Sequence, residues 1–298
     1  MSCPDCFKGA IHSHKGSPRG HEEDLHGVRT YITGPPTSAS ASPSTSQSTI
    51  IYLTDAFGLS LINNKLLADA YATRTGLRVL APALIPGGPA PLALLEPMEA
   101  AFDSIAWWDL WGQLTRLGNL FTTIRLLALF YLRANPGRAS TYAPILAYAR
   151  AVKAGLPPGA RLGVCGFCWG GYSSTKLCGE AAVAGGGERL VDAQFCAHPS
   201  ALTAEMVVEA VTRWKVPYAV AVGDRDFVFK GKQVEETEAA LRVKAGDGMG
   251  ERGCWYELRV YAGCQHGFAV RARPGDEVQE RGAEEACGQA VEWFRRWL

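Results

Sequence analysis

The segment that most constrains the architecture of this chain reads Gly163-Val164-Cys165-Gly166-Phe167-Cys168-Trp169-Gly170-Gly171-Tyr172. Residues 161–164 end a short apolar run of strand character, and residues 172–183 have the pattern of a helix. The glycines between them permit a turn too tight for residues with a Cβ. The spacing Gly166-x-Cys168-x-Gly170 matches the nucleophile elbow G-x-S-x-G, with cysteine in place of serine. The pattern predicts a thiolate at the edge of a sheet, stabilised by the N-terminus of a helix.

Strands and helices alternate on both sides of this segment. The predicted strands are apolar runs at 49–54, 77–80, 191–197, 216–222 and 255–261. Helical periodicity covers 61–75, 142–154, 205–214, 231–244 and 276–298. Such alternation predicts an α/β fold with a mostly parallel central sheet, helices on both faces and ligands outside the carboxyl ends of the strands. We expect a single domain over residues 1–298.

Three segments do not fit the alternation. We expect an irregular N-terminal segment at 1–26, a first strand at 27–33 and a flexible Pro- and Ser-rich loop at 34–49. Residues 86–136 form a helical insertion rich in aromatic residues, including Trp107 and Trp108. Aromatic residues at this density most often belong to a core. The alternative is a cap that lines an apolar substrate pocket.

The composition argues against several classes of partner. The chain has 298 residues, 47% of them hydrophobic, and a formal net charge of +1. It therefore has no general electrostatic reason to bind nucleic acid or an anionic membrane. Residues 117–132, the longest apolar region, are interrupted by polar residues and too short to span a bilayer. We expect a small-molecule substrate and a monomer or homodimer.

The cysteines suggest the compartment. Nine cysteines and an N-terminus without an apolar signal region indicate a reduced, cytoplasmic protein. A zinc site could be drawn from two N-terminal pairs, Cys3 with Cys6 and His12 with His14. Their spacing does not match the usual zinc finger, so we expect no metal and no cofactor.

Several ionisable or nucleophilic side chains each follow the end of a predicted strand: Asp55, Cys168, His198, Asp226 and His266. A parallel sheet brings such residues to one edge. Cys168, Asp226 and His266 appear in the order nucleophile, acid, histidine of the α/β-hydrolase triad. Cys168 would attack an acyl carbonyl, His266 would move the proton, and Asp226 would orient His266. The backbone N–H groups of Ala56 and Trp169 would bind the oxyanion.

Three residues compete for these roles. Asp224 could be the acid, but Asp226 lies further beyond the strand and is better placed to reach back to the histidine. His198 could be the base, although a histidine before proline is more often a wall residue or a hydrogen-bonded structural group. Cys165 and Cys168 form a C-x-x-C motif typical of redox pairs. Cys165, however, should point into the sheet packing.

The chain resembles the dienelactone hydrolase family of α/β-hydrolases, and in particular its fungal members. The likeness covers residues 49–298 and rests on the motifs Gly166-Phe167-Cys168-Trp169-Gly170-Gly171, Asp226-Phe227-Val228, His266-Gly267-Phe268-Ala269 and Asp55-Ala56-Phe57-Gly58. The resemblance implies a triad of Cys168, Asp226 and His266 and an oxyanion hole of Ala56 and Trp169. It also implies hydrolysis of an ester or lactone without a cofactor.

Two features depart from the best-known lactonases of that family. Asp55 stands where they have a glutamate that holds the resting thiol and helps to activate it. They also grip the substrate carboxylate with two arginines. One has no counterpart after Pro82, and the other is replaced by Val270, with Arg271 next to it. We therefore expect a larger, less charged ester or lactone, such as an aromatic polyketide intermediate. The pocket would be lined by Asp55, Phe57, His198, Arg271, Trp107 and Trp108.

Two other classes of function stay open at this point. The fold could serve non-hydrolytic biosynthetic chemistry, such as cyclisation, lactone rearrangement or retro-aldol cleavage. In that case Cys168→Ala could leave turnover intact while His266→Ala abolishes it. A non-catalytic binding protein on the same scaffold would neither hydrolyse activated esters nor be labelled at Cys168.

Overall fold

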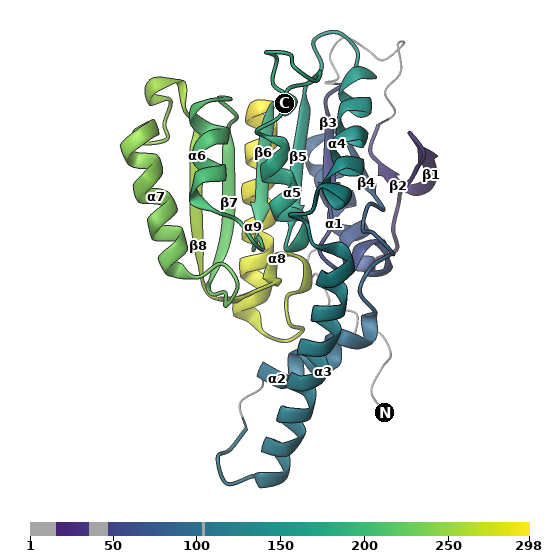
Figure 1. Ribbon diagram of the computed structural model, residues 1–298, viewed down its shortest axis with the longest axis vertical. Coiled ribbons are helices and arrows are strands. Elements are labelled where there is room, and N and C mark those ends of the chain that lie inside the picture. Colours follow the sequence, from purple (N-terminus) through teal and green to yellow (C-terminus); the bar gives the residue numbers. More distant parts are fainter. Residues whose placement is uncertain (1–15, 36–46, 103–104) are drawn as a thin grey trace.

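The computed structural model describes residues 16–35, 47–102 and 105–298 (Figure 1). The candidate zinc ligands at positions 3, 6, 12 and 14, and most of the 34–49 loop, lie outside these residues. The strands are β1 (His21–Leu25), β2 (Val28–Thr33), β3 (Thr49–Leu53), β4 (Arg78–Pro82), β5 (Leu162–Phe167), β6 (Ala193–Ala197), β7 (Tyr218–Arg225) and β8 (Tyr256–Gln265). They form one 8-stranded sheet in the order β1-β2-β4-β3-β5-β6-β7-β8. β1 and β2 pair antiparallel, as do β2 and β4, and every pairing from β4 onward is parallel.

Helices cover both faces of this sheet. The helices are α1 (Ile62–Thr75), α2 (Leu95–Phe102), α3 (Leu110–Ala134), α4 (Ala139–Ala154), α5 (Trp169–Leu177), α6 (Ala204–Thr212), α7 (Gly231–Ala245), α8 (Phe268–Arg271) and α9 (Glu277–Trp297), with 3-10 turns at Gly58–Ser60, Leu92–Leu94 and Glu251–Gly253. α1, α8 and α9 pack together on one face, and α4, α5 and α6 on the other, with α7 beside α6 (Figure 1). This arrangement confirms the predicted α/β fold class.

The central strands are buried along their whole length, as their apolar runs predict. No residue of β3, β5 or β6 is exposed. The rings of Tyr52 and Phe167 stack with centroids 4.7 Å apart, and Phe195 adjoins Phe167. Each buried ring of this size stabilises the fold by about 1.5–3 kcal/mol. The well-packed strands therefore hold the residues that follow them in fixed positions at the carboxyl edge.

The two outer regions of the sheet differ from the sequence prediction. His21–Leu25, expected within the irregular segment 1–26, is edge strand β1. Its charged sequence lacks an apolar pattern because it is held mainly through backbone pairing with β2. β7 and β8 continue to Arg225 and Gln265, beyond their predicted ends, and pair with each other there. Their exposed polar residues carry no strand-like alternation, which is why the extension was not predicted.

Residues 86–136 contain α2 and α3, together called the arm, which project beyond the sheet (Figure 1). The prediction that the aromatic residues of this insertion form core is wrong for Trp107 (81% exposed), Trp108 (70%), Trp111 (79%) and Phe121 (70%). The C-terminal part of α3 packs on the body of the molecule, and there Phe130 is buried. Helical periodicity in the sequence does not show which part of a helix packs on the rest of the protein and which part extends into solvent. In the described part of the chain, no helix is long and apolar enough to cross a membrane.

Candidate active site

Cys168 lies at the sharp turn between β5 and α5. Its φ of 49° and ψ of −111° form a backbone conformation that residues with a Cβ rarely adopt. The turn requires glycine on both sides of the cysteine. A Cβ on Gly166 would collide with the carbonyl oxygen of Gly170 and the hydroxyl of Ser174, and one on Gly170 would collide with the backbone of Leu53. The half-buried thiol is therefore fixed at the N-terminus of α5.

Asp226 and His266 meet just beyond the ends of β7 and β8. Nδ1 of His266 lies 3.0 Å from each carboxylate oxygen of Asp226. Asp226 is buried, and its Oδ1 accepts the backbone N–H groups of Val228 at 2.7 Å and Phe229 at 3.0 Å. These bonds fix the carboxylate, and the carboxylate in turn favours the His266 tautomer with hydrogen on Nδ1. The other ring nitrogen, Nε2, is then left for the thiol.

Cys168 lies close enough to His266 for the two groups to interact, and it completes the group. Burial alone would lower the pKa of His266. The interactions of His266 with Cys168 and with Asp226 outweigh burial and raise this pKa to about 9. An imidazolium at neutral pH stabilises a thiolate, which is the nucleophilic form of cysteine. The structure thus brings together the three side chains that the sequence predicted as a triad.

The two N–H groups predicted to form the oxyanion hole follow the neighbouring strands β3 and β5. Trp169 is the first residue of α5, and the first N–H groups of a helix have no intrahelical acceptor. Its indole Nε1 donates to the carbonyl oxygen of Ala134 at 2.6 Å, which fixes Trp169 against α3. Ala56 lies in the turn after β3, the strand next to β5. Its carbonyl oxygen accepts the N–H of Ala90 at 2.8 Å, and this bond holds the turn in place.

Asp55 is the centre of a buried cluster next to this turn. Its Oδ1 accepts from Nδ2 of Asn64 at 2.9 Å and from the N–H of Phe57 at 3.1 Å. Its Oδ2 lies 3.4 Å from Nε of Arg271, without hydrogen-bond geometry. Burial raises the pKa of Asp55, against the opposing effect of the Arg271 charge. The Arg271 guanidinium also lies over the Phe57 ring, 5.3 Å from its centroid. Arg271, rather than Val270, therefore stands beside the buried carboxylate.

The residues that competed for triad roles are not placed to fill them. Asp224 is exposed and accepts the N–H of Gly263 at 2.7 Å. His198 is fully buried, with its ring centroid 5.1 Å from that of His266. Burial and the charge of His266 lower the pKa of His198 well below its usual range. His198 is therefore a neutral side chain that packs next to His266 in the wall of the site. Cys165 is fully buried in β5, and burial raises the pKa of its thiol, which disfavours a redox thiolate.

Ser200 and Tyr131 lie next to the Cys168 turn and were not predicted as site residues. The N–H of Ser200 donates to the carbonyl of Cys168 at 2.9 Å, and its hydroxyl lies 3.3 Å from that of Tyr131. Burial and the charge of Cys168 raise the pKa of Tyr131 to about 12, so its hydroxyl stays protonated. Ser200 could have been found from its position after a predicted strand. Tyr131 had no such signal among the many aromatic residues of the insertion.

A cavity of about 220 Å³ opens beside His266. Its apolar side is formed by Met98 and Phe227. Its other walls are polar or cationic: Arg225, Gln265, Arg271, Arg273 and Gln279. Trp107 and Trp108, predicted to line the pocket, lie instead in the exposed turn before α3. They do not reach this cavity because the arm carries them away from the sheet (Figure 1).

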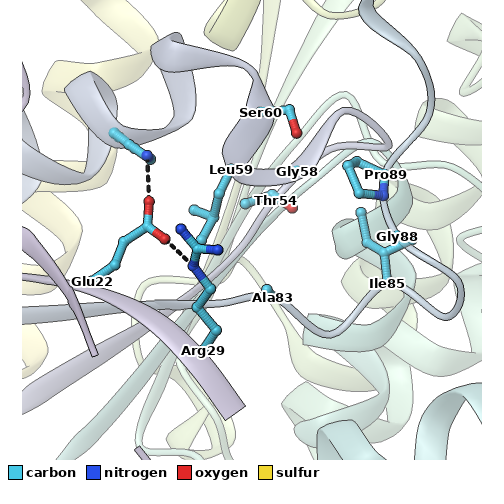
Figure 2. A pocket seen from close by; sticks show the side chains of 11 residues that line it. Glu22, Arg29, Thr54, Gly58, Leu59, Ser60, Ala83, Ile85, Gly88 and Pro89 are labelled. Atoms are coloured by element: carbon cyan, nitrogen blue, oxygen red, sulfur yellow. Dashed lines mark hydrogen bonds and ion pairs between the residues drawn. The ribbon is translucent and has the colours of Figure 1, made fainter. Parts of the chain in front are cut away.

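A second cavity, of about 370 Å³, is lined in part by the turn that follows β3 (Figure 2). It is lined by Glu22, Arg29, Thr54, Gly58, Leu59, Ser60, Lys65, Ala83, Ile85, Gly88 and Pro89. Glu22 accepts hydrogen bonds from both Lys65 and Arg29 (Figure 2). The hydrogen bond from Lys65 lowers the pKa of Glu22. The charges at the rim of this cavity are thus paired with one another.

Comparison with known proteins gives a consistent result. Residues 35–298 match the sequence profile of the dienelactone hydrolase family. The chain is 23% identical to Hydrolase pyvD of Aspergillus violaceofuscus over 293 residues, which covers 98% of this chain and 96% of that protein. It is 25% identical to Hydrolase tropI of Talaromyces stipitatus over 300 residues, 100% of this chain and 96% of that protein. Among solved structures, an esterase from Thermogutta terrifontis superposes with a TM-score of 0.53 at 14% identity, covering 92% of each chain, which shows a shared fold.

Proposed function

Since the chain belongs to the dienelactone hydrolase family, we propose that it hydrolyses a carboxylic ester or lactone through a thioester on Cys168. The observation that carries this proposal is the hydrogen-bonded pair of Asp226 and His266, which lies next to Cys168 at its strained turn. A carboxylate, an imidazole and a thiol arranged in this order are the groups that nucleophilic acyl transfer requires. A binding protein would have no use for a histidine held between the other two.

The reaction starts from the Cys168 thiolate and protonated His266. The thiolate attacks the acyl carbon, and the carbonyl electrons move onto the oxygen, which accepts hydrogen bonds from the N–H groups of Ala56 and Trp169. As the intermediate collapses, the carbon–oxygen bond to the leaving group breaks and the alkoxide takes the proton from Nε2 of His266. Water then gives a proton to His266 while its oxygen attacks the thioester. The acid is released, and the thiolate and imidazolium are restored.

The cavity beside His266 guides the choice of substrate. We propose an aromatic, polyketide-derived ester or lactone whose ring packs against Met98 and Phe227, with an acidic oxygen directed toward Arg271. The sequence led us to expect a substrate with little charge. The cationic side chains in the cavity wall favour a substrate that also carries one acidic group. A cavity of about 220 Å³ is smaller than most ligand sites, which range over about 300–1,000 Å³. Part of the substrate therefore stays outside it.

Hydrolysis of p-nitrophenyl acetate and labelling by a thiol-directed probe together test the proposal. Cys168→Ala should lose the label and lower the esterase rate at least ~10³-fold. Asp226→Asn should also be impaired, whereas Asp224→Asn, a matched change two residues away on the exposed side, should not. Full esterase rate and labelling in Cys168→Ala would show that the nucleophile is wrong. Turnover of a natural substrate that survives Cys168→Ala but not His266→Ala would favour non-hydrolytic chemistry.

A further inference from the structure

The arm leaves a regular apolar stripe of α3 in contact with solvent. The stripe is formed by the side chains Leu110, Leu114, Leu117, Phe121, Ile124 and Ala128. The five large ones are 58–75% exposed. The first half of α3 lies beyond the sheet and its covering helices (Figure 1), so the rest of the described chain leaves these side chains open.

The spacing of the stripe indicates what kind of surface covers it. Successive members are separated alternately by four and three residues, which is a heptad repeat with Leu114, Phe121 and Ala128 at a positions and Leu110, Leu117 and Ile124 at d positions. A period of 3.5 residues keeps a narrow seam facing one partner helix. The positions that flank the seam hold Trp111, Gly118 and Arg125 on one side and Gln113, Leu120 and Leu127 on the other. The polar face opposite the seam holds Thr115, Arg116, Asn119 and Thr122. A helix that rests on a membrane has a broader apolar face and a polar face rich in Lys and Arg.

The exposed apolar area is that of a protein interface. Trp107, Trp108, Trp111 and Phe121 are 70–81% exposed. At ~200 Å² for a fully exposed aromatic side chain, these four leave on the order of 600 Å² in solvent. Phe121 belongs to the stripe and the three tryptophans lie beyond or beside it, so this is the area of the whole free end of the arm. The largest apolar patch on a typical monomer is about 300–600 Å². A stable complex buries about 800 Å² on each partner.

We propose that two copies of this chain pair through this stripe as an antiparallel two-helix coiled coil. With a two-fold axis between Leu117 and Phe121, Leu117 packs against the partner's Phe121. Leu114 then packs against the partner's Ile124, so a positions meet d positions along the seam. The antiparallel arrangement puts the two bodies at opposite ends of the paired helices, where they do not collide. It also brings Arg125 near the partner's Trp111, an arrangement suited to a cation–π contact.

The parts of the chain outside the described residues do not offer a matching surface. Residues 1–15 contain three large apolar side chains, Met1, Phe7 and Ile11, and residues 36–46 contain none. Three side chains cannot fill a seam of six positions. A second copy supplies all six in the matching order.

Light scattering coupled to size exclusion tests the proposal with the 298-residue chain loaded at about 1 to about 100 μM, because dimerisation depends on concentration. The wild type should elute with the mass of two chains. Leu117→Glu and the uncharged Phe121→Gln should each raise the dimer dissociation constant at least ~100-fold. Thr122→Glu adds the same charge on the polar side of α3 and should remain dimeric. Because Leu117 and Phe121 are exposed in a single chain, both variants should keep the circular dichroism spectrum of the wild type.

Several results would overturn the proposal. The proposal is wrong if the wild type is monomeric at every concentration, or if the dimer persists in both Leu117→Glu and Phe121→Gln. It is also wrong if Thr122→Glu dissociates the dimer as much as these two substitutions do. A monomeric wild type that floats with phosphatidylcholine–phosphatidylserine vesicles, and loses this in Leu117→Glu, would assign the stripe to lipid instead.

Discussion

The pairing of His266 with Cys168 makes the stability of the protein depend on pH in a defined direction. The pKa of His266 rises from its ordinary value of 6.5 to about 9 on folding, because Cys168 and Asp226 outweigh the effect of burial. A group whose pKa is raised by folding stabilises the folded state through its protonated form. The stabilisation is therefore complete below about pH 6.5 and is lost as the pH rises through about 9. The rise in pKa corresponds to about 3 kcal/mol of unfolding free energy.

Urea unfolding at about pH 6 and about pH 9.5 measures this contribution when the wild type is compared with His266→Gln. Between these two pH values the unfolding free energy of the wild type should fall by about 3 kcal/mol more than that of the variant. Subtracting the variant removes the contribution of titrating groups that do not interact with His266. Cys168→Ala should retain little of the difference, because Cys168 makes the largest contribution that raises the His266 pKa. Equal pH dependence in wild type and His266→Gln would refute the reasoning.

Other substitutions test single contacts. Asp226→Asn keeps an acceptor for the backbone N–H groups that follow it but turns an N–H toward His266, so steady-state kcat for p-nitrophenyl acetate should fall at least ~10³-fold with little change in KM. Gly170→Ala puts a Cβ into the backbone of the adjacent strand and should lower the unfolding free energy by about 3 kcal/mol or more, measured by urea titration. Arg271→Gln should raise KM about tenfold for an aryl ester that carries a carboxylate and leave KM for its neutral analogue nearly unchanged.

The sheet and the triad could be predicted because their causes are local in the sequence. A strand covered on both faces must be apolar throughout, so β3 and β5 were visible as apolar runs. Ionisable or nucleophilic side chains just beyond the carboxyl ends of parallel strands lie at one edge of the sheet. Asp226 and His266 lie close together for this reason. β1 is held by backbone pairing at an edge, and pairing of that kind leaves no pattern in charged side chains.

The surroundings of the triad depend on contacts that spacing does not encode. Arg271 reaches Asp55 because α8 turns back toward α1, and nothing in the residues around position 271 shows this turn. The tryptophans near position 107 have the composition of core or pocket residues. Their exposure follows from the direction in which α3 leaves the body, which is a property of the assembled fold. The sequence therefore predicted the positions of the proposed triad residues better than those of the pocket walls.

Helix α3 links the proposed seam to the thiol. Near its C-terminus, the Tyr131 hydroxyl contacts Ser200, which donates its N–H to the carbonyl of Cys168, and Ala134 accepts the hydrogen bond from the Trp169 indole. A partner that pairs with the free half of α3 would hold the whole helix, and with it Tyr131, in one position. If so, kcat per chain for p-nitrophenyl acetate should fall about two- to fivefold when the wild type is diluted below its dimer dissociation constant. Leu117→Glu should show the low value at every concentration and Thr122→Glu should follow the wild type. A kcat that is the same for dimer and monomer would show that the seam assembles the protein without acting on the site.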